Sequence, residues 1–253
     1  MELRQLASFL AVAEEGRFTR AAADAVADLR HDREAALRIG VMGHGSAELT
    51  PAIIRAFARA RPGTPLELRP LDFTEHVTAV VEHKVDVAFV RPAPDDERVA
   101  VYVLTREPRI VVVPARGEFA EAEALRLADV LDLSYLDVPP STPRTFTDYL
   151  YFMAARGGER PRRSPDRARN PQEVLASVAA GRGAGSALYS FRRFYPWPGT
   201  RGVPVVDAPW EESVLVTRAG DRRPEVAAFR ALAAGMARDL GPLLVPAPVL
   251  PGA

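Results

Sequence analysis

The stretch LRIGVMGHGSAELTPAIIRAFARARPGTPLELRPLDFTEHVTAVVEHKVDVAFV, residues 37–90, decides the fold. Three short apolar runs in it predict β-strands, at Leu37–Met42, Leu66–Arg69 and Val85–Val90. Two amphipathic patterns between these runs predict helices, at Pro51–Ala60 and Glu75–Glu82. Strands separated by helices of this length indicate βαβ units with a parallel sheet, so the chain is predicted to be of the α/β class.

The loops that follow the three predicted strands are the first candidates for a ligand site. They are Gly43–Glu48, Asp72–Glu75 and Arg91–Pro94. Because ligands of open α/β sheets bind in the crevice outside the carboxyl ends of the strands, we expect these loops to lie together. The sequence therefore predicts a small-molecule site formed by these loops.

The rest of the chain repeats the alternation of strands and helices more loosely. Further strands are predicted at Arg109–Pro114, Ser134–Val138, Ala184–Tyr189, Val203–Val206 and Ser213–Thr217. Further helices are predicted at Phe146–Ala155, Pro171–Ala180 and Pro224–Leu240. A second α/β unit is therefore expected after the first.

The composition excludes several kinds of site. The 253 residues carry 33 basic and 33 acidic side chains, so nucleic-acid binding would have to depend on a local patch. The absence of cysteine excludes disulfides, cysteine-ligated zinc and thiol nucleophiles. His44 with Glu48, and His76 with His83, lack a third residue at metal-ligand spacing. We therefore expect no metal, no cofactor and no catalytic site.

Two features bear on the compartment. No stretch reaches the ~18–20 apolar residues that a membrane helix needs. The N-terminal apolar run Leu6–Ala13 ends at Glu14-Glu15 and has helix-face spacing, which argues against a signal peptide. A cytoplasmic protein without a membrane partner is expected.

An arginine-rich segment, ARGGERPRRSPDRARN, spans residues 155–170. Six arginines against Glu159 and Asp166 give it a local net charge of +4. Such a segment is typical of a solvated loop with one short edge strand. The alternative interpretation is a patch for an anion or for a phosphate backbone.

Several loose motifs, taken together, resemble the effector-binding domain of LysR-type transcriptional regulators. They are LRIGV…LTPAIIRAFARARPGTPLELR…VVEHKVDVAFV, then VAAGRGAGSALYS, then VLVTRAGDRRPEVAAFRALA. The resemblance implies a fold like type 2 periplasmic binding proteins, with two α/β lobes joined by two crossover strands. Lobe I would comprise residues 37–108 and 209–245, lobe II residues 109–208, and a Pro-rich tail residues 246–253.

The N-terminal segment MELRQLASFLAVAEEGRFTRAA resembles the first helix, and the start of the second, of the family's winged helix-turn-helix. It runs directly into AADAVADLRHDREAA, which resembles the end of the linker helix. The recognition helix that would enter the major groove is missing between them. Residues 1–36 are therefore expected to be a remnant, in which Arg17, Thr19 and Arg20 could still contact DNA. Promoter binding is expected to be weak or lost.

The resemblance also implies an effector site between the lobes. The candidate residues there are Ser46, Thr74, Arg91, Ser141, Thr142 and Arg144. A hydroxyl near a helix N-terminus, such as Ser46, favours a carboxylate or a similar anion, and Arg144 is the candidate for pairing it. Ser46 and Thr74 could instead only cap helices, and Arg144 could be a solvent-facing charge.

Two further expectations concern assembly and function. The resemblance implies pairing through the edge strand Leu37–Met42 and the helix Pro51–Ala60, with Ile53, Ile54 and Phe57 supplying apolar surface for a homodimer or homotetramer. The expected function is a ligand-responsive LysR-type regulator. The alternative is a free-standing small-molecule-binding or dimerisation module without DNA-binding activity.

Overall fold

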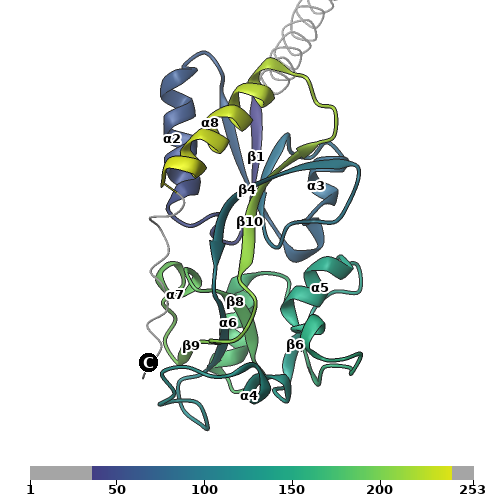
Figure 1. The fold of residues 1–253 in the computed structure, drawn as a ribbon, viewed down its shortest axis with the longest axis vertical. Helices are drawn as coiled ribbons and strands as arrows, with labels where there is room; N and C mark the ends of the chain where they lie inside the picture. The colour runs from purple at the N-terminus through teal and green to yellow at the C-terminus, as the bar shows by residue number, and fades with distance from the viewer. Residues whose placement is uncertain (1–35, 241–253) are drawn as a thin grey trace, which may run out of the picture.

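The computed structural model describes residues 36–240, which form two α/β lobes stacked one above the other (Figure 1). Two strands, β4 (Val99–Glu107) and β10 (Glu211–Arg218), run from one lobe toward the other. The remnant predicted for residues 1–36, apart from Ala36, lies outside the described residues. So do the end of lobe I at 241–245 and the tail at 246–253.

The first lobe is built on a five-stranded sheet with the order β2–β1–β3–β10–β4. In it β1 (Leu37–Met42) pairs in parallel with β2 (Leu66–Leu71) on one side and with β3 (Val87–Val90) on the other. This confirms the predicted βαβ arrangement. The expectation that Leu37–Met42 is an edge strand is wrong, because β2 covers it and is itself the edge.

Two helices, α2 (Leu49–Ala60) and α8 (Pro224–Leu240), pack side by side on this sheet (Figure 1). Ile53 and Phe57 of α2 are fully buried in the apolar cluster that α8 completes, and Ile54 is partly buried against the same cluster. This corrects the expectation that these three side chains supply spare apolar surface for an interface. Their apolar surface is used inside the lobe.

The helix predicted at Glu75–Glu82 is broken in two. A 3-10 turn, η1 (Phe73–Glu75), comes first, and the α-helix α3 covers only Thr78–Val81. Asp72 sets the early start, because its carboxylate accepts hydrogen bonds from the amide and the hydroxyl of Thr74 at 2.8 and 2.6 Å. The β-branched residues at positions 77, 78, 80 and 81 then shorten the helix, since they lose χ1 freedom in it.

The second lobe is built around β5 (Arg109–Pro114), and its neighbours β8 (Gly185–Leu188) and β9 (Thr200–Pro204) both run antiparallel to it. A parallel pair, β6 and β7, joins β8 through a bridge between Tyr135 and Ala184. The remaining elements are β6 (Tyr135–Asp137), β7 (Arg163–Arg167), α4 (Leu127–Leu131), α5 (Arg144–Leu150), η2 (Met153–Ala155), α6 (Pro171–Ala179) and α7 (Phe191–Phe194).

A buried carboxylate, Asp86, holds several elements of the first lobe together at the end of the sheet opposite the ligand loops. Asp86 is fully buried and accepts from the backbone amide and the guanidinium of Arg38, both at 2.9 Å. It also accepts from Arg218 at 3.2 Å and from Arg223 at 2.8 Å. Asp86 therefore joins β1, β3 and β10 to the start of α8.

Among residues 36–240, no helix is long and apolar enough to cross a membrane. Within the same residues, no three His, Asp or Glu side chains gather in an arrangement that could hold a metal ion.

Candidate ligand-binding site

A cavity of about 60 Å³ lies between the lobes. The first lobe contributes Met42, Gly43, Phe73 and Arg91 to its wall, each at or just beyond the carboxyl end of a strand. Most of the second lobe's contribution is aromatic or aliphatic, from β6, α5, α6 and β8. Each of the three predicted loops therefore contributes at least one residue to the cavity wall.

Two charged residues line this cavity. Asp137 is already paired with Arg163 and Arg167, which makes Arg91 the charge of interest. Its side chain follows β3 and is 7% exposed. Nη1 donates to Nδ1 of His44 at 3.1 Å, whereas Nε and Nη2 are buried without a hydrogen-bond partner among the described residues. Burial lowers the pKa of the Arg91 guanidinium, but no nearby carboxylate pairs with it within hydrogen-bond distance in this part of the chain. A buried cation with unused donors is suited to bind an anion.

His44 links Arg91 to the second lobe. Because Nδ1 accepts from Arg91, Nε2 carries the proton and donates to Oγ of Ser190 at 2.7 Å. The backbone amide of Ser190 donates in turn to the carboxylate of Glu107 at 2.8 Å. Burial, reinforced by the positive charges of Arg91 and Arg193, lowers the pKa of His44 well below its usual value. The imidazole is therefore neutral at physiological pH.

The loop that carries His44 docks on α7 of the second lobe. The imidazole stacks on the ring of Phe194, with 5.1 Å between the centroids, and meets the edges of Phe191 and Tyr195. At the end of the same loop, Glu48 forms an ion pair with Arg193 at 2.9 Å. One flank of the cavity is thus closed by direct contacts between the lobes.

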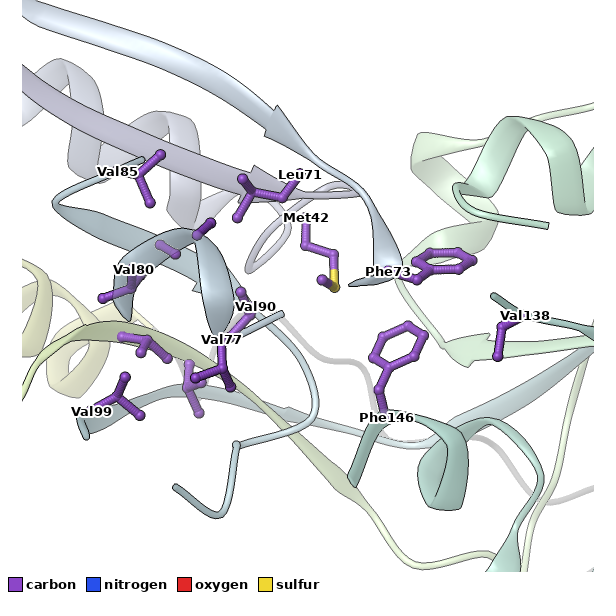
Figure 2. Close-up of a cluster of buried hydrophobic side chains, with 14 residues drawn as sticks. Met42, Leu71, Phe73, Val77, Val80, Val85, Val90, Val99, Val138 and Phe146 are labelled. Atoms are coloured by element: carbon purple, nitrogen blue, oxygen red, sulfur yellow. The ribbon is translucent and has the colours of Figure 1, made fainter. Parts of the chain in front are cut away.

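The opposite flank is closed by η1. Arg169 of the second lobe pairs with Asp72 at 2.9 Å, and its carbonyl oxygen accepts from the amide of Phe73 at 2.9 Å. Figure 2 shows the rings of Phe73 and Phe146 facing each other across the lobe boundary, with 4.9 Å between the centroids. The apolar core of the first lobe therefore continues into the second.

The two predicted hydroxyls of the first lobe are used in local structure. Ser46 is fully buried; its amide donates to Oγ1 of Thr50 at 2.7 Å, and its hydroxyl accepts from Ser213 of β10 at 2.8 Å. Thr74 lies inside η1 and donates its hydroxyl to Asp72; Asp72, and not Thr74, caps this turn, so the expectation that Thr74 caps a helix is wrong. Neither residue lines the cavity.

The three predicted residues of the second lobe also lie away from the cavity wall. Ser141 is exposed, and Thr142 is buried with a hydroxyl that has no partner among the described residues. The side chain of Arg144 is 91% exposed and lies 3.4 Å from Asp148. Arg144 is therefore a solvent-facing charge, and of the six candidates the structure brings only Arg91 to the cavity.

The arginine-rich segment is tied to the fold more closely than a solvated loop. Arg163 and Arg167 both pair with Asp137, and Arg169 pairs with Asp72. The guanidinium of Arg156 is buried and donates to two backbone carbonyl oxygens, at 2.7 and 2.8 Å. Four of the six arginines therefore already have partners in the fold, which leaves little of this segment free for a polyanion.

The role of His44 in joining the lobes was not predicted from the sequence, where this histidine is a candidate only as half of a metal pair with Glu48. The signal that could have identified it is its position, since a histidine between two glycines directly after a strand lies at the ligand end of a parallel sheet.

The sequence of this chain is similar to a known protein family and to several known regulators. The family described as LysR substrate binding domain matches residues 30–238. The HTH-type transcriptional regulator IlvR of Caulobacter vibrioides is 29% identical over 213 residues, which cover 81% of this chain and 70% of that protein. The chain spans about half the length of two other regulators that it matches, AlsR of Bacillus subtilis and BenM of Acinetobacter baylyi.

Solved structures share the fold. The BenM effector binding domain with its effector benzoate has a TM-score of 0.64 at 22% identity, over 86% of this chain and 98% of that one. The effector binding domain of QuiR in complex with shikimate has a TM-score of 0.67 at 13% identity, over 81% and 97% of the two chains.

His76, beside this cavity, should make the fold sensitive to acid. It is fully buried, Nε2 donates to the carbonyl oxygen of Pro92 at 2.7 Å, and burial lowers its pKa to about 4. The unfolded chain takes up a proton near pH 6.5, so stability should be constant above that pH and fall as the pH drops toward 4. The loss should reach about 2 kcal/mol at pH 5.

Urea unfolding of the wild type and of His76→Gln at pH 7, 6 and 5 checks this. Glutamine keeps an N–H donor near the Pro92 carbonyl and removes the titrating group, so the variant should lose less stability on acidification. His83→Asn, at an exposed histidine, is the control. Identical pH dependence in the wild type and His76→Gln would contradict the assignment.

Proposed function

The chain belongs to the LysR family of transcriptional regulators, through a substrate binding domain at residues 30–238, and from that premise we propose that the cavity between its lobes senses a small organic anion. The observation that carries the proposal is Arg91, a buried guanidinium on the cavity wall, two of whose nitrogens have no hydrogen-bond partner within residues 36–240. A buried charge without a hydrogen-bonded counter-charge is costly, and an anionic ligand would offset that cost.

The chemistry of the wall narrows the ligand class. A carboxylate can accept two parallel hydrogen bonds from a guanidinium, and the aromatic and aliphatic wall would receive an apolar body. The ligands in the titles of the two similar structures, benzoate and shikimate, are both carboxylates of this kind. At such low sequence identity, the similarity shows a shared fold and not a shared ligand. The proposal for this chain therefore rests on Arg91.

The size of the cavity implies movement. Ligand pockets are typically ~300–1,000 Å³, several times the volume found here. A metabolite would therefore enter when the lobes separate, and the contacts His44–Ser190 and Asp72–Arg169 are those that must yield and re-form. A ligand bound in the cavity would in this way change the contacts that hold the two lobes together.

The proposed role is regulation and not catalysis. IlvR, AlsR and BenM are named as transcriptional regulators. The alternative is a free-standing binding or dimerisation module, and it depends on the segment that holds Arg17, Thr19 and Arg20, which lies outside the described residues. Selective DNA binding in the measurement below would exclude this alternative.

Arg91→Met should weaken binding of a small carboxylate by about 10- to 150-fold, because one charge-assisted contact is worth ~1.5–3 kcal/mol. Thermal-shift screening of aromatic and aliphatic carboxylates would find a ligand, and calorimetric titration would compare the variants. Arg144→Met removes an exposed arginine and is the matched control, with affinity expected to be unchanged. Loss of affinity in the control, or none in Arg91→Met, would remove Arg91 from the site.

On DNA, this chain should distinguish a LysR-type promoter from random duplex by less than about tenfold, against ~10³ or more for a working regulator. Three basic or hydroxyl side chains could support only weak binding, with log K falling by ~0.9 per phosphate neutralised as log salt rises. Fluorescence anisotropy with both duplexes at two salt concentrations measures this. Nanomolar, sequence-selective binding at physiological salt would overturn the expectation and exclude the module alternative.

We also propose a homodimer or homotetramer, paired through β2 and α2 of the first lobe. Leu68, 58% exposed on the edge strand β2, supports this surface. Light scattering should report at least a dimer at micromolar concentration, and Leu68→Lys should raise the monomer fraction. A wild-type monomer at every concentration would refute the pairing.

A further inference from the structure

Most of the polar side chains on the cavity wall already have partners within the protein. Those that line the wall are Arg91, Tyr135, Asp137, Tyr149, Tyr151 and Ser186. The hydroxyls of Tyr135, Tyr151 and Ser186 donate to backbone carbonyl oxygens at 2.9, 3.2 and 2.7 Å. Asp137 pairs with two arginines, at 3.1 and 3.3 Å. Arg91 and Tyr149 therefore remain to receive a ligand.

Tyr149 is held in place through its ring and its backbone. The residue lies on α5 and is buried, and the guanidinium carbon of Arg109 lies 4.0 Å from the centre of its ring. Arg109 also donates to the carbonyl oxygen of Tyr149 at 2.7 Å. The Tyr149 hydroxyl, by contrast, makes no hydrogen bond within residues 36–240. The ring is therefore fixed on the cavity wall, and its hydroxyl is left for another group.

The two remaining groups are hydrogen-bond donors from opposite lobes. Arg91 offers Nε and Nη2, which have no acceptor in the part of the chain that the structure describes. Burial raises the pKa of the Tyr149 hydroxyl despite the positive charges of Arg109 and Arg91, so the hydroxyl keeps its proton at physiological pH. Tyr149 is also the ionisable group that acts most strongly on the Arg91 guanidinium. In a cavity of about 60 Å³, both donors therefore face the same part of a ligand.

We propose that Tyr149 determines specificity at this site by donating to an oxygen on the carbon next to the ligand's carboxylate, so that the site selects 2-oxo and 2-hydroxy acids. This inference rests on the proposed function, in which Arg91 binds the carboxylate. A plain carboxylate leaves the Tyr149 hydroxyl without an acceptor. A 2-amino acid is disfavoured because its ammonium group is a cation without a lone pair, and Asp137, the carboxylate among the described wall residues, is already paired twice.

Calorimetric titration with matched ligands tests the proposal. One set is phenylpyruvate, 3-phenylpropanoate and phenylalanine, and a second is 4-methyl-2-oxopentanoate, 4-methylpentanoate and leucine. Within each set the ligands differ only at the carbon next to the carboxylate. The wild type should bind the 2-oxo acid of at least one set about 3- to 10-fold more tightly than the plain carboxylate, which is the effect of one neutral hydrogen bond. The amino acid should bind more weakly than either.

Tyr149→Phe should abolish the preference for the 2-oxo acid and leave the affinity for the plain carboxylate within about twofold, because only the hydroxyl is lost. Tyr102→Phe removes a hydroxyl from β4, outside the cavity, and should keep the preference. An unchanged preference in Tyr149→Phe, together with lost binding in Arg91→Met, overturns the role of Tyr149 and leaves the carboxylate site standing. No carboxylate binding by the wild type, or unchanged affinity in Arg91→Met, overturns both.

Thermal unfolding gives a second test that needs no ligand. Tyr149→Phe should unfold within about 1 °C of the wild type, because its hydroxyl has no partner to lose. Tyr151→Phe loses the bond to the carbonyl oxygen of Leu136 and should unfold about 2–4 °C lower. A decrease in Tyr149→Phe as large as that in Tyr151→Phe would mean that the hydroxyl is bonded within the protein, and it would overturn the proposal.

Discussion

The ion cluster around Asp86 is the interaction on which the first lobe depends. Burial alone would raise the pKa of this carboxyl, but hydrogen bonds from Arg38, and then from Arg223, outweigh it and hold the pKa far below the usual value. Three arginines from the beginning of β1, the end of β10 and the start of α8 converge on it. Removal of one partner from such a buried cluster typically costs ~3–5 kcal/mol. The cluster lies at one end of the strands, and the loops that follow β1, β2 and β3 at the other end face the second lobe.

The two ends of strand β3, in the first lobe, carry buried charges with opposite surroundings. Asp86 is compensated by three guanidinium groups, whereas the hydrogen bond that the Arg91 side chain makes within the described residues goes to a neutral histidine. Both residues flank the same strand, β3, Asp86 just before it and Arg91 just after it. A protein that satisfies a buried charge at one end of a strand and leaves one incomplete at the other has the second available for an exogenous group.

Where that group would act follows from the contacts beside Arg91. The guanidinium holds His44, and His44 holds Ser190, so a change at Arg91 is transmitted to the lobe boundary through two hydrogen bonds. The ion pairs Glu48–Arg193 and Asp72–Arg169 lie on either side. Under the proposed function, a ligand at Arg91 would therefore act on side chains that also join the lobes, through His44 and Ser190.

Sequence reasoning identified the right loops and mostly the wrong side chains. The loops follow from strand order alone, and Gly43, Phe73 and Arg91 do line the cavity. A hydroxyl near a helix start, which makes Ser46 a candidate, can bind an anion, and Thr74 is a candidate because it follows the second strand and resembles a family pocket position. The structure instead joins Ser46 to Ser213 and Thr74 to Asp72 by hydrogen bonds. Arg144 was chosen for its charge, but the direction in which it points is set by α5, which turns it to solvent.

The sequence by itself determined most elements of the first lobe, because apolar periodicity and turn residues are local properties that short segments carry alone. It did not predict β4, and it predicted one helix where η1 and α3 stand. It also determined the class of fold through the alternation of strands and helices. Only the tertiary structure decided that β2, and not β1, is an edge strand of the five-stranded sheet, and that α8 buries the apolar face of α2. It also decided that His44 joins Arg91 to Ser190. Each of these is a contact between residues far apart in the chain, and a polar side chain becomes a site only where such contacts leave it unsatisfied.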